Sequence, residues 1–225
     1  MRVCAWAGGT LFVASLVYFL FTYELTFGDV HEGPWNPADV AWNAALFTGF
    51  AFHHSLFARR PVRAFIARMV PADLERTLYV VLASVLFILV CALWRPVPGA
   101  AWQLDGPAAW LLRATQLAGV WLTLRSAATL GVSHLSGLKP PSDAPAEFKA
   151  TGPYGWVRHP IYTGWYLTLF AAPVMTMTRL EFAAISGVYL LLAIPFEERT
   201  LEALAGDGYR QYLRQVKWKL VPGIY

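Results

Sequence analysis

Two short strings in the C-terminal third of the chain hold residue types that could bind and orient a charged small molecule. The first, GPYGWVRHPIYTGW, runs from Gly152 to Trp165 at the start of an apolar stretch. Pro160 suits the first turn of a helix, because its missing N–H would be unpaired there anyway, so we expect a helix to begin at about His159 or Pro160. The unpaired amides and the dipole of such a helix start favour an anion.

Charged and aromatic side chains gather around this helix start. Arg158 and His159 add charge and hydrogen-bond donors, and Tyr154 and Tyr162 add aromatic faces and hydroxyl groups. Arginine, tryptophan and tyrosine at the end of a membrane span are also typical interfacial anchors, so a purely structural role stays open for each of them alone. The cluster as a whole indicates a binding site.

The second string, FEERTLEALAGDGYRQY, runs from Phe196 to Tyr212 and brings two adjacent acids. We expect Glu197 and Glu198 on the same membrane face as His159, because a helical hairpin returns the chain to the side from which it started. Acids near the C-terminal end of a helix oppose its dipole unless a cation offsets them. A cationic ligand could be that partner, and a solvated helix end is the structural alternative.

S-adenosylmethionine needs this combination of groups. Its sulfonium and ammonium cations suit glutamates and aromatic rings, its carboxylate suits the helix start, and its ribose diol suits an acidic acceptor. No G-x-G-x-x-G follows a predicted strand, which excludes a Rossmann-type cofactor site. No zinc-like cluster occurs in the sequence, and we expect no metal.

The elements that must position these residues are membrane helices. Of the 225 residues, 57% are hydrophobic and only 14% are charged, which is too apolar for an ordinary soluble domain. The last two apolar stretches are short, and we expect them to form a hairpin with a tight turn around Thr178 and Arg179. The stretches that predict membrane spans cover approximately 4–24, 38–57, 77–94, 108–130, 161–178 and 180–196.

The lysines and arginines predict the orientation. With the loops assigned alternately to the two sides, one side receives nearly all of these residues and the other receives only Arg95 and Arg179. The rich side is expected to be cytoplasmic, which places both termini in the cytoplasm. The basic residues are therefore interpreted as topological signals, and no nucleic-acid partner is expected.

These patterns predict an all-α, polytopic protein of a bacterial-type inner membrane. It has about six transmembrane helices, including the C-terminal hairpin, and a cytoplasmic C-terminal helix. We expect one membrane domain over 1–225, in which 1–130 is a four-span substrate-side bundle and 131–225 holds the cofactor-binding loop, the hairpin and the last helix. That last helix is predicted from an apolar face at helical spacing, formed by Leu201, Leu204, Ala205, Tyr209, Tyr212, Leu213 and Val216.

Residues 152–225 resemble the C-terminal region of the isoprenylcysteine carboxyl methyltransferase and phospholipid methyltransferase superfamily. The family pattern R-H-P-x-Y-x-G, E-E-x-x-L and F-G-x-x-Y-x-x-Y with a late proline is matched by RHPIYTG, EERTL, AGDGYRQY and Pro222, with Ala205 in place of the phenylalanine. The resemblance implies S-adenosylmethionine as methyl donor. It implies cofactor contacts from Tyr154, His159, Pro160, Ile161, Tyr162 and Glu197, and from Glu147, Phe148 and Lys149 in the preceding loop.

The N-terminal half is similar to bacterial methanethiol S-methyltransferases and to NnrU-like membrane proteins. The strings that carry this similarity are HHSLFARRPVRAF and PADLERTLYVVLASVLFILVCALWRPVP. Polar groups at the ends of spans often line a site, although Glu75 could instead pair with Arg76 or another arginine of the same loop. The catalytic residues stay unknown, with Arg158, His53, Glu75 and Arg76 as candidates.

The resemblance implies a membrane-embedded, S-adenosylmethionine-dependent methyltransferase. Its acceptor would be a small or lipophilic molecule from the membrane, either a methanethiol-like thiol or an isoprenylcysteine-type carboxylate. Ala193 stands where the eukaryotic carboxyl methyltransferases have an arginine for the substrate carboxylate, which favours the thiol. The alternatives are an NADPH-dependent membrane reductase of the sterol-reductase type, which shares an R-H-P-x-Y segment, and a non-catalytic NnrU-like accessory protein that holds haem or a partner through His53, His54 or His134.

Overall fold

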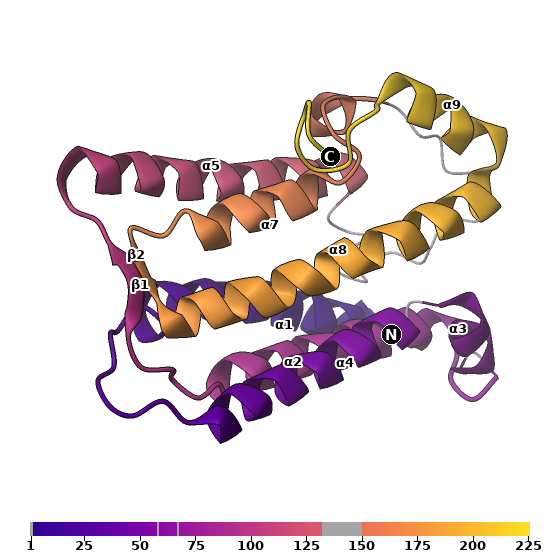
Figure 1. Ribbon diagram of the computed structural model, residues 1–225. Coiled ribbons are helices and arrows are strands. Elements are labelled where there is room, and N and C mark those ends of the chain that lie inside the picture. The colour runs from indigo at the N-terminus through magenta and orange to yellow at the C-terminus, as the bar shows by residue number, and fades with distance from the viewer. Residues whose placement is uncertain (1, 58, 67, 132–149) are drawn as a thin grey trace. The chain divides into compact units, whose positions relative to one another are not determined.

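The computed structural model describes residues 2–57, 59–66, 68–131 and 150–225 (Figure 1). The chain is mostly helical, with one short two-stranded sheet, β1 and β2, that the sequence did not suggest. In chain order the elements are α1 (Arg2–Phe21), the π-helix η1 (Thr22–Thr26), α2 (Pro37–Phe57), α3 (Arg60–Ile66), α4 (Ala72–Ala92), β1 (Ala100–Gln103), α5 (Gly106–Leu130), the 3₁₀ helix η2 (Gly152–Gly155), α7 (Pro160–Phe170), β2 (Val174–Thr176), α8 (Met177–Ala205) and α9 (Asp207–Gln215).

Helices of membrane-spanning character confirm that this is a membrane protein. Within the described part of the chain, three helices are long and apolar enough to cross a bilayer: Trp6–Thr26, Leu74–Ala92 and Met177–Ala205. The predicted stretches at 38–57 and 108–130 also coincide with helices, α2 and α5.

The predicted hairpin differs in detail from the observed one. α7 has only 11 residues, or roughly 16 Å at 1.5 Å per residue, so the prediction of a helical span over 161–178 is wrong. Pro173, which lacks a backbone N–H, prevents the helix from continuing. The predicted turn around Thr178 and Arg179 is also wrong, because both residues are buried in the first turn of α8.

The segment that contains α7 nevertheless follows the whole length of α5. At one end Gly152 lies beside Thr129, with 3.6 Å between a Cβ added there and the Thr129 hydroxyl oxygen. At the other end the Leu104 N–H donates to the Pro173 carbonyl at 3.0 Å. Residues outside α7, η2 on one side and Pro173 on the other, therefore complete a path that α7 alone is too short to make.

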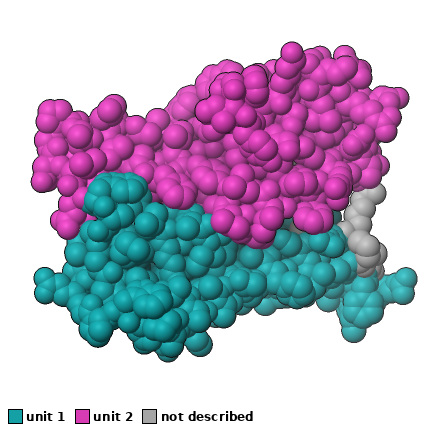
Figure 2. Space-filling view, in the orientation of Figure 1, with its two compact units in different colours: residues 1–102, 133–141, 175–185 teal, residues 103–132, 142–174, 186–225 magenta. Residues whose placement is uncertain are grey.

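Residues 2–102 and 175–185, within the described ranges, form one compact unit (teal in Figure 2). Its centre is Phe182, a fully buried residue of α8 whose ring lies 5.1 Å from that of Trp94 and 5.5 Å from that of Phe19. Arg179, one turn earlier, donates to the backbone carbonyls of Tyr23 and Glu24. A buried arginine thus satisfies two carbonyl groups of η1, which explains why it does not lie in a loop.

Residues 103–131, 150–174 and 186–225 form the second compact unit (magenta in Figure 2). Here α5 and α7 pack side by side (Figure 1) through two glycines. A Cβ on Gly164 would lie 2.6 Å from the Gly119 carbonyl oxygen, and one on Gly119 would lie 2.7 Å from the Gly164 carbonyl oxygen. Small residues permit such close backbone approach in membrane helix pairs.

The C-terminal helical pattern is confirmed as a packing face except at Leu204, which is exposed, and it does not form one helix. α8 continues to Ala205, Gly206 adopts a φ of 52°, and α9 follows. Tyr209, Tyr212 and Val216 are buried together against Leu201, Ala205 and Leu213. The left-handed conformation at Gly206 is one that glycine adopts without steric cost, which permits the change of direction.

The prediction of one membrane domain with a division near residue 130 stays a prediction. In the structure α5 belongs with α7 rather than with the helices that precede it, because the glycine contact joins these two elements.

Gly164→Ala should destabilise the second unit. The added methyl would overlap the Gly119 carbonyl oxygen and the Thr123 side chain, and overpacking of this kind typically costs about 1–3 kcal/mol. A thermal unfolding scan of the purified protein should show a lower midpoint. Gly49→Ala in α2, which meets no atom within 4 Å, is the matched control and should leave the midpoint unchanged or raise it.

Candidate functional site

The first turn of α7 is the centre of the candidate site. α7 begins at Pro160 with His159 immediately before it, which confirms the predicted helix start. His159 is buried, with 6% of its surface exposed. Its imidazole therefore lies at the end of the helix that carries the partial positive charge of the dipole.

A C-terminal segment pairs with the residues that precede α7. The backbone N–H of Arg158 donates to the Trp218 carbonyl, and the backbone N–H of His159 donates to the Lys219 carbonyl, each at 2.9 Å. Groups some 60 residues apart in sequence are thus joined by main-chain hydrogen bonds. This pairing holds the Arg158 and His159 side chains in place from the backbone outward.

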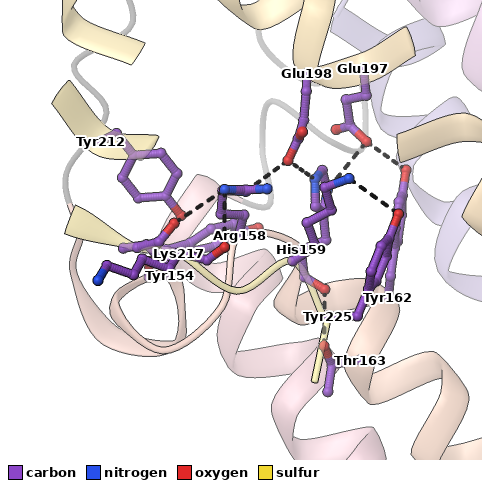
Figure 3. Close-up of polar contacts among 12 residues, drawn as sticks. Tyr154, Arg158, His159, Tyr162, Thr163, Glu197, Glu198, Tyr212, Lys217 and Tyr225 are labelled. Carbon is purple, nitrogen blue, oxygen red and sulfur yellow. Dashed lines mark hydrogen bonds and ion pairs between the residues drawn. The ribbon is translucent and has the colours of Figure 1, made fainter. Parts of the chain in front are cut away.

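Glu198, on α8, forms the buried ionic contact of the site (Figure 3). One carboxylate oxygen, Oε1, lies 2.8 Å from Arg158 Nε and 3.2 Å from His159 Nε2. Only 17% of the Glu198 side chain and 11% of the Arg158 side chain are exposed. Charges so removed from solvent are stable only when they are paired, so each of these side chains requires the other.

Arg158 also contacts the C-terminal segment. Its Nη1 donates to the carbonyls of Val216 and Lys217, at 3.4 and 3.2 Å. Its Nε–H is close to Glu198 but is not aligned for a hydrogen bond, and it has no other acceptor among the residues that the structure describes. The ion pair with Glu198 therefore holds this side of the guanidinium.

Glu197, the adjacent acid on α8, has the more open carboxylate, with 43% of its side chain exposed. Its Oε2 accepts a hydrogen bond from the Tyr162 hydroxyl at 2.8 Å and lies 3.6 Å from His159 Nδ1. The His159 and Tyr162 rings are stacked, with 5.3 Å between centroids and 14° between planes. An accessible carboxylate, a phenol and an aromatic surface therefore lie together.

Two further tyrosines border these groups. The Tyr212 hydroxyl donates to the Tyr154 carbonyl at 2.9 Å. Burial raises the pKa of Tyr154 above its usual range, and the charge of Glu197 raises it further. Burial likewise raises the pKa of Tyr212 to about 12, against the opposing charge of Arg158. Both phenols therefore keep their protons at neutral pH, and the Tyr154 hydroxyl is a hydrogen-bond donor rather than a base.

Sequence comparison relates the chain to enzymes of known name. It is 34% identical to a methanethiol S-methyltransferase of Crocosphaera subtropica over 78% of this chain and 71% of that protein. It is 37% identical to one of Mycobacterium tuberculosis over 80% of this chain and 78% of that protein. This chain belongs to the methanethiol S-methyltransferase family. The predicted resemblance is confirmed, and the protein is a membrane methyltransferase.

More distant relatives of this methyltransferase occur in animals. The chain is 28% identical to a Nurim homolog of Drosophila melanogaster over 68% of this chain and 66% of that protein. No protein-family model matches the chain, and no solved structure matches it.

The methyltransferase structure brings most of the predicted cofactor residues to one place. Around the first turn of α7 it gathers Tyr154, Arg158, His159, Pro160, Ile161, Tyr162, Glu197 and Glu198. Glu147, Phe148 and Lys149 lie outside the described residues, as does His134. That these residues bind a cofactor stays a prediction.

One argument for the two glutamates is wrong. They do not lie near the C-terminal end of a helix, because α8 continues to Ala205. The cations that offset Glu198 are side chains of the enzyme itself, Arg158 and, when protonated, His159. The sequence argument failed because it ended the helix where the apolar stretch ends.

The other catalytic candidates, His53, Glu75 and Arg76, lie in the first unit. Glu75 pairs with Arg63 through two hydrogen bonds of 2.9 and 3.0 Å, which is the structural alternative to a catalytic role. This hydrogen bond with Glu75 raises the pKa of Arg63. Arg76 lies over the ring of Tyr79, with 5.1 Å between its guanidinium carbon and the ring centroid.

Sequence reasoning missed the role of the tail in the site. Thr163 Oγ1 donates to the Leu220 carbonyl at 2.8 Å, in addition to the backbone contacts of Arg158 and His159. Carbonyl acceptors leave no side-chain pattern that could have revealed them. Tyr212 was expected only on a packing face. It is the second tyrosine of the family pattern F-G-x-x-Y-x-x-Y, which was an available signal for a role in the site.

The two adjacent glutamates should differ in their effect on stability. Glu198→Gln leaves Arg158 buried without its counter-charge, and breaking a buried pair typically costs about 3–5 kcal/mol. Glu197→Gln removes a charge that is 43% exposed and should change the unfolding midpoint far less. Thermal unfolding of both variants measures this difference, and equal midpoints would contradict the assignment of the structural role to Glu198.

Proposed function

We propose that this enzyme transfers the methyl group of S-adenosylmethionine to a small thiol of the methanethiol type. The observation that carries the proposal is the group formed by Glu197, Tyr162 and His159 at the start of α7. It is supported by relatives that are named methanethiol S-methyltransferases. S-adenosylmethionine would supply the electrophilic methyl group.

The residues present fit this methyl donor. The accessible carboxylate of Glu197 suits a ribose diol or a cation, and the stacked His159 and Tyr162 rings suit an adenine or a sulfonium. The amides of the first turn of α7 suit a carboxylate. Among the described residues no group of three His, Cys, Asp or Glu could hold a metal ion, and we propose a reaction without one.

We assign cofactor contact to Tyr154, His159, Pro160, Ile161, Tyr162 and Glu197, with Glu147, Phe148 and Lys149 as further candidates. Glu198, also a predicted contact, would act through Arg158 and His159, because its carboxylate already faces both. Arg158 would orient the donor.

A thiol is favoured over a carboxylate acceptor by charge. Ala193 offers no cation to an isoprenylcysteine-type carboxylate at the position where a family arginine would meet it. A thiolate that attacks a sulfonium leaves two neutral products, so a site shielded from water by the membrane favours the reaction. No observation favours the reductase or the accessory-protein alternatives.

We further propose a polytopic arrangement with about six crossings and both termini in the cytoplasm. α1, α2, α4, α5 and α8 would each cross as a helix, and the segment that contains α7 would cross as a short helix with non-helical ends. The excess of basic residues on one set of loops supports the orientation, in a bacterial-type inner membrane. The site at the start of α7 would then face the cytoplasm, where S-adenosylmethionine is made.

Glu197→Gln should weaken binding of S-adenosylmethionine. A hydrogen bond to a charged group contributes about 1.5–3 kcal/mol, so the dissociation constant measured with labelled donor should rise by roughly ten- to a hundredfold. Formation of dimethyl sulfide from methanethiol should fall with it. Glu202→Gln is the matched control, because Glu202 is on the same helix with a similarly exposed side chain, 42% against 43%.

The proposal fails if the wild-type protein binds no labelled S-adenosylmethionine and Glu197→Gln behaves as Glu202→Gln does. Binding of NADPH in its place would favour the reductase, and a haem absorbance band without methyl transfer would favour the accessory protein.

Single cysteines placed at Asp207, in α9, and at Asp105, before α5, should be accessible from opposite sides of the membrane. Asp207, whose side chain is 98% exposed, lies on the proposed cytoplasmic side, and the exposed Asp105 lies before α5 on the other side. In intact cells, an impermeant thiol reagent applied from outside should label Asp105→Cys and leave Asp207→Cys unlabelled until the inner membrane is opened. Labelling of both from outside would refute the orientation.

A further inference from the structure

Lys219 carries a positive charge beside the candidate site, and the contacts described above involve only its backbone. Its carbonyl accepts the His159 N–H at 2.9 Å, so the residue lies next to the start of α7. Its side chain is half-buried, and the ammonium interacts electrostatically with the Glu198 carboxylate. Lys219, His159 and Glu198 all belong to the second compact unit, so their proximity is a property of that unit alone.

The Lys219 side chain is held by Tyr225, which lies among the polar groups of the candidate site (Figure 3). Nζ donates to the Tyr225 hydroxyl at 3.2 Å and lies 4.6 Å from the centroid of the Tyr225 ring. The Tyr225 carbonyl oxygen in turn accepts the backbone N–H groups of Lys219, Leu220 and Val221, at 2.9, 2.8 and 3.0 Å. A lysine fixed in this way loses less rotamer freedom when it binds a ligand than a free surface lysine does.

The Lys219 ammonium still has donors for a ligand. An ammonium has three N–H donors, and in the described part of the chain Lys219 uses one of them, toward a neutral phenol. It makes no ion pair at contact distance with a described carboxylate. Arg158, by contrast, is committed to Glu198 and to two backbone carbonyls. Lys219 is therefore a cation beside the site that can still bind an anion.

The proposed methyl donor has one anionic group, the carboxylate of its amino-acid part. A lysine repels the sulfonium and the ammonium of this molecule and attracts only the carboxylate. The group formed by Glu197, Tyr162 and His159 suits the cationic and aromatic parts instead. The charges around the start of α7 therefore suit opposite ends of one ligand.

We propose that Lys219, fixed by Tyr225, binds the carboxylate of the methyl donor. The inference rests on the proposed methyl transfer from S-adenosylmethionine and adds two residues of the C-terminal segment to its binding site. That segment then has two roles. Its backbone carbonyls support the residues at the start of α7, and its lysine contacts the ligand.

Decarboxylated S-adenosylmethionine separates this role from a structural one, because it keeps the sulfonium and the ammonium and lacks the carboxylate. Lys219→Met removes the charge and keeps most of the length of the side chain. Since a hydrogen bond to a charged group contributes roughly tenfold or more in affinity, the dissociation constant of labelled S-adenosylmethionine should rise by about that factor. The dissociation constant of the labelled decarboxylated donor should not rise.

Arg214→Met is the matched control for the loss of one positive charge. Arg214 is an exposed residue in the last turn of α9, and this variant should bind both ligands as the wild type does. Lys219→Arg keeps the charge and should restore most of the affinity for S-adenosylmethionine.

If Lys219→Met does not fold, Tyr225→Phe decides. It removes the hydroxyl that fixes the ammonium and keeps the ring beneath it. Binding of S-adenosylmethionine should weaken severalfold, and binding of the decarboxylated donor should stay unchanged.

The outcomes distinguish the two proposals. If the wild-type protein binds neither ligand, the proposed function fails. If it binds them, and the deciding variant weakens both equally or neither, the proposed function stands and the role of Lys219 is refuted.

Discussion

The candidate site depends on one buried carboxylate, that of Glu198. It lies against Arg158 and His159, and Arg158 in turn holds the carbonyls of Val216 and Lys217. Removing a charge from water costs several kcal/mol unless a partner offsets it, so α8, the start of α7 and the C-terminal tail must come together for any of them to be stable. The same contact that stabilises this part of the chain therefore assembles the site.

This arrangement explains why two adjacent glutamates can have different roles. Neighbouring residues on a helix point about 100° apart, so one carboxylate can face inward while the other stays accessible. Glu198 is paired with cations of the enzyme itself. Glu197 accepts a hydrogen bond from the Tyr162 hydroxyl and lies near His159 Nδ1. The accessible acid is the one that suits a ligand, and its neighbour keeps the surrounding groups in position.

Buried charges in the first unit follow the same rule. Arg179 donates to two carbonyls of η1, and Glu75 is paired with Arg63.

The sequence by itself determined the membrane class, the helix start at Pro160 and the neighbourhood of His159 and the two glutamates. The membrane class follows from composition, and the helix start follows from the covalent geometry of proline. The neighbourhood of His159 and the glutamates follows because the chain returns to the side from which it started. Tertiary structure alone decided which acid pairs with Arg158 and why Arg179 is buried. Such choices depend on contacts between residues that are distant along the chain, and their partners are often backbone carbonyls, which are the same in every residue type.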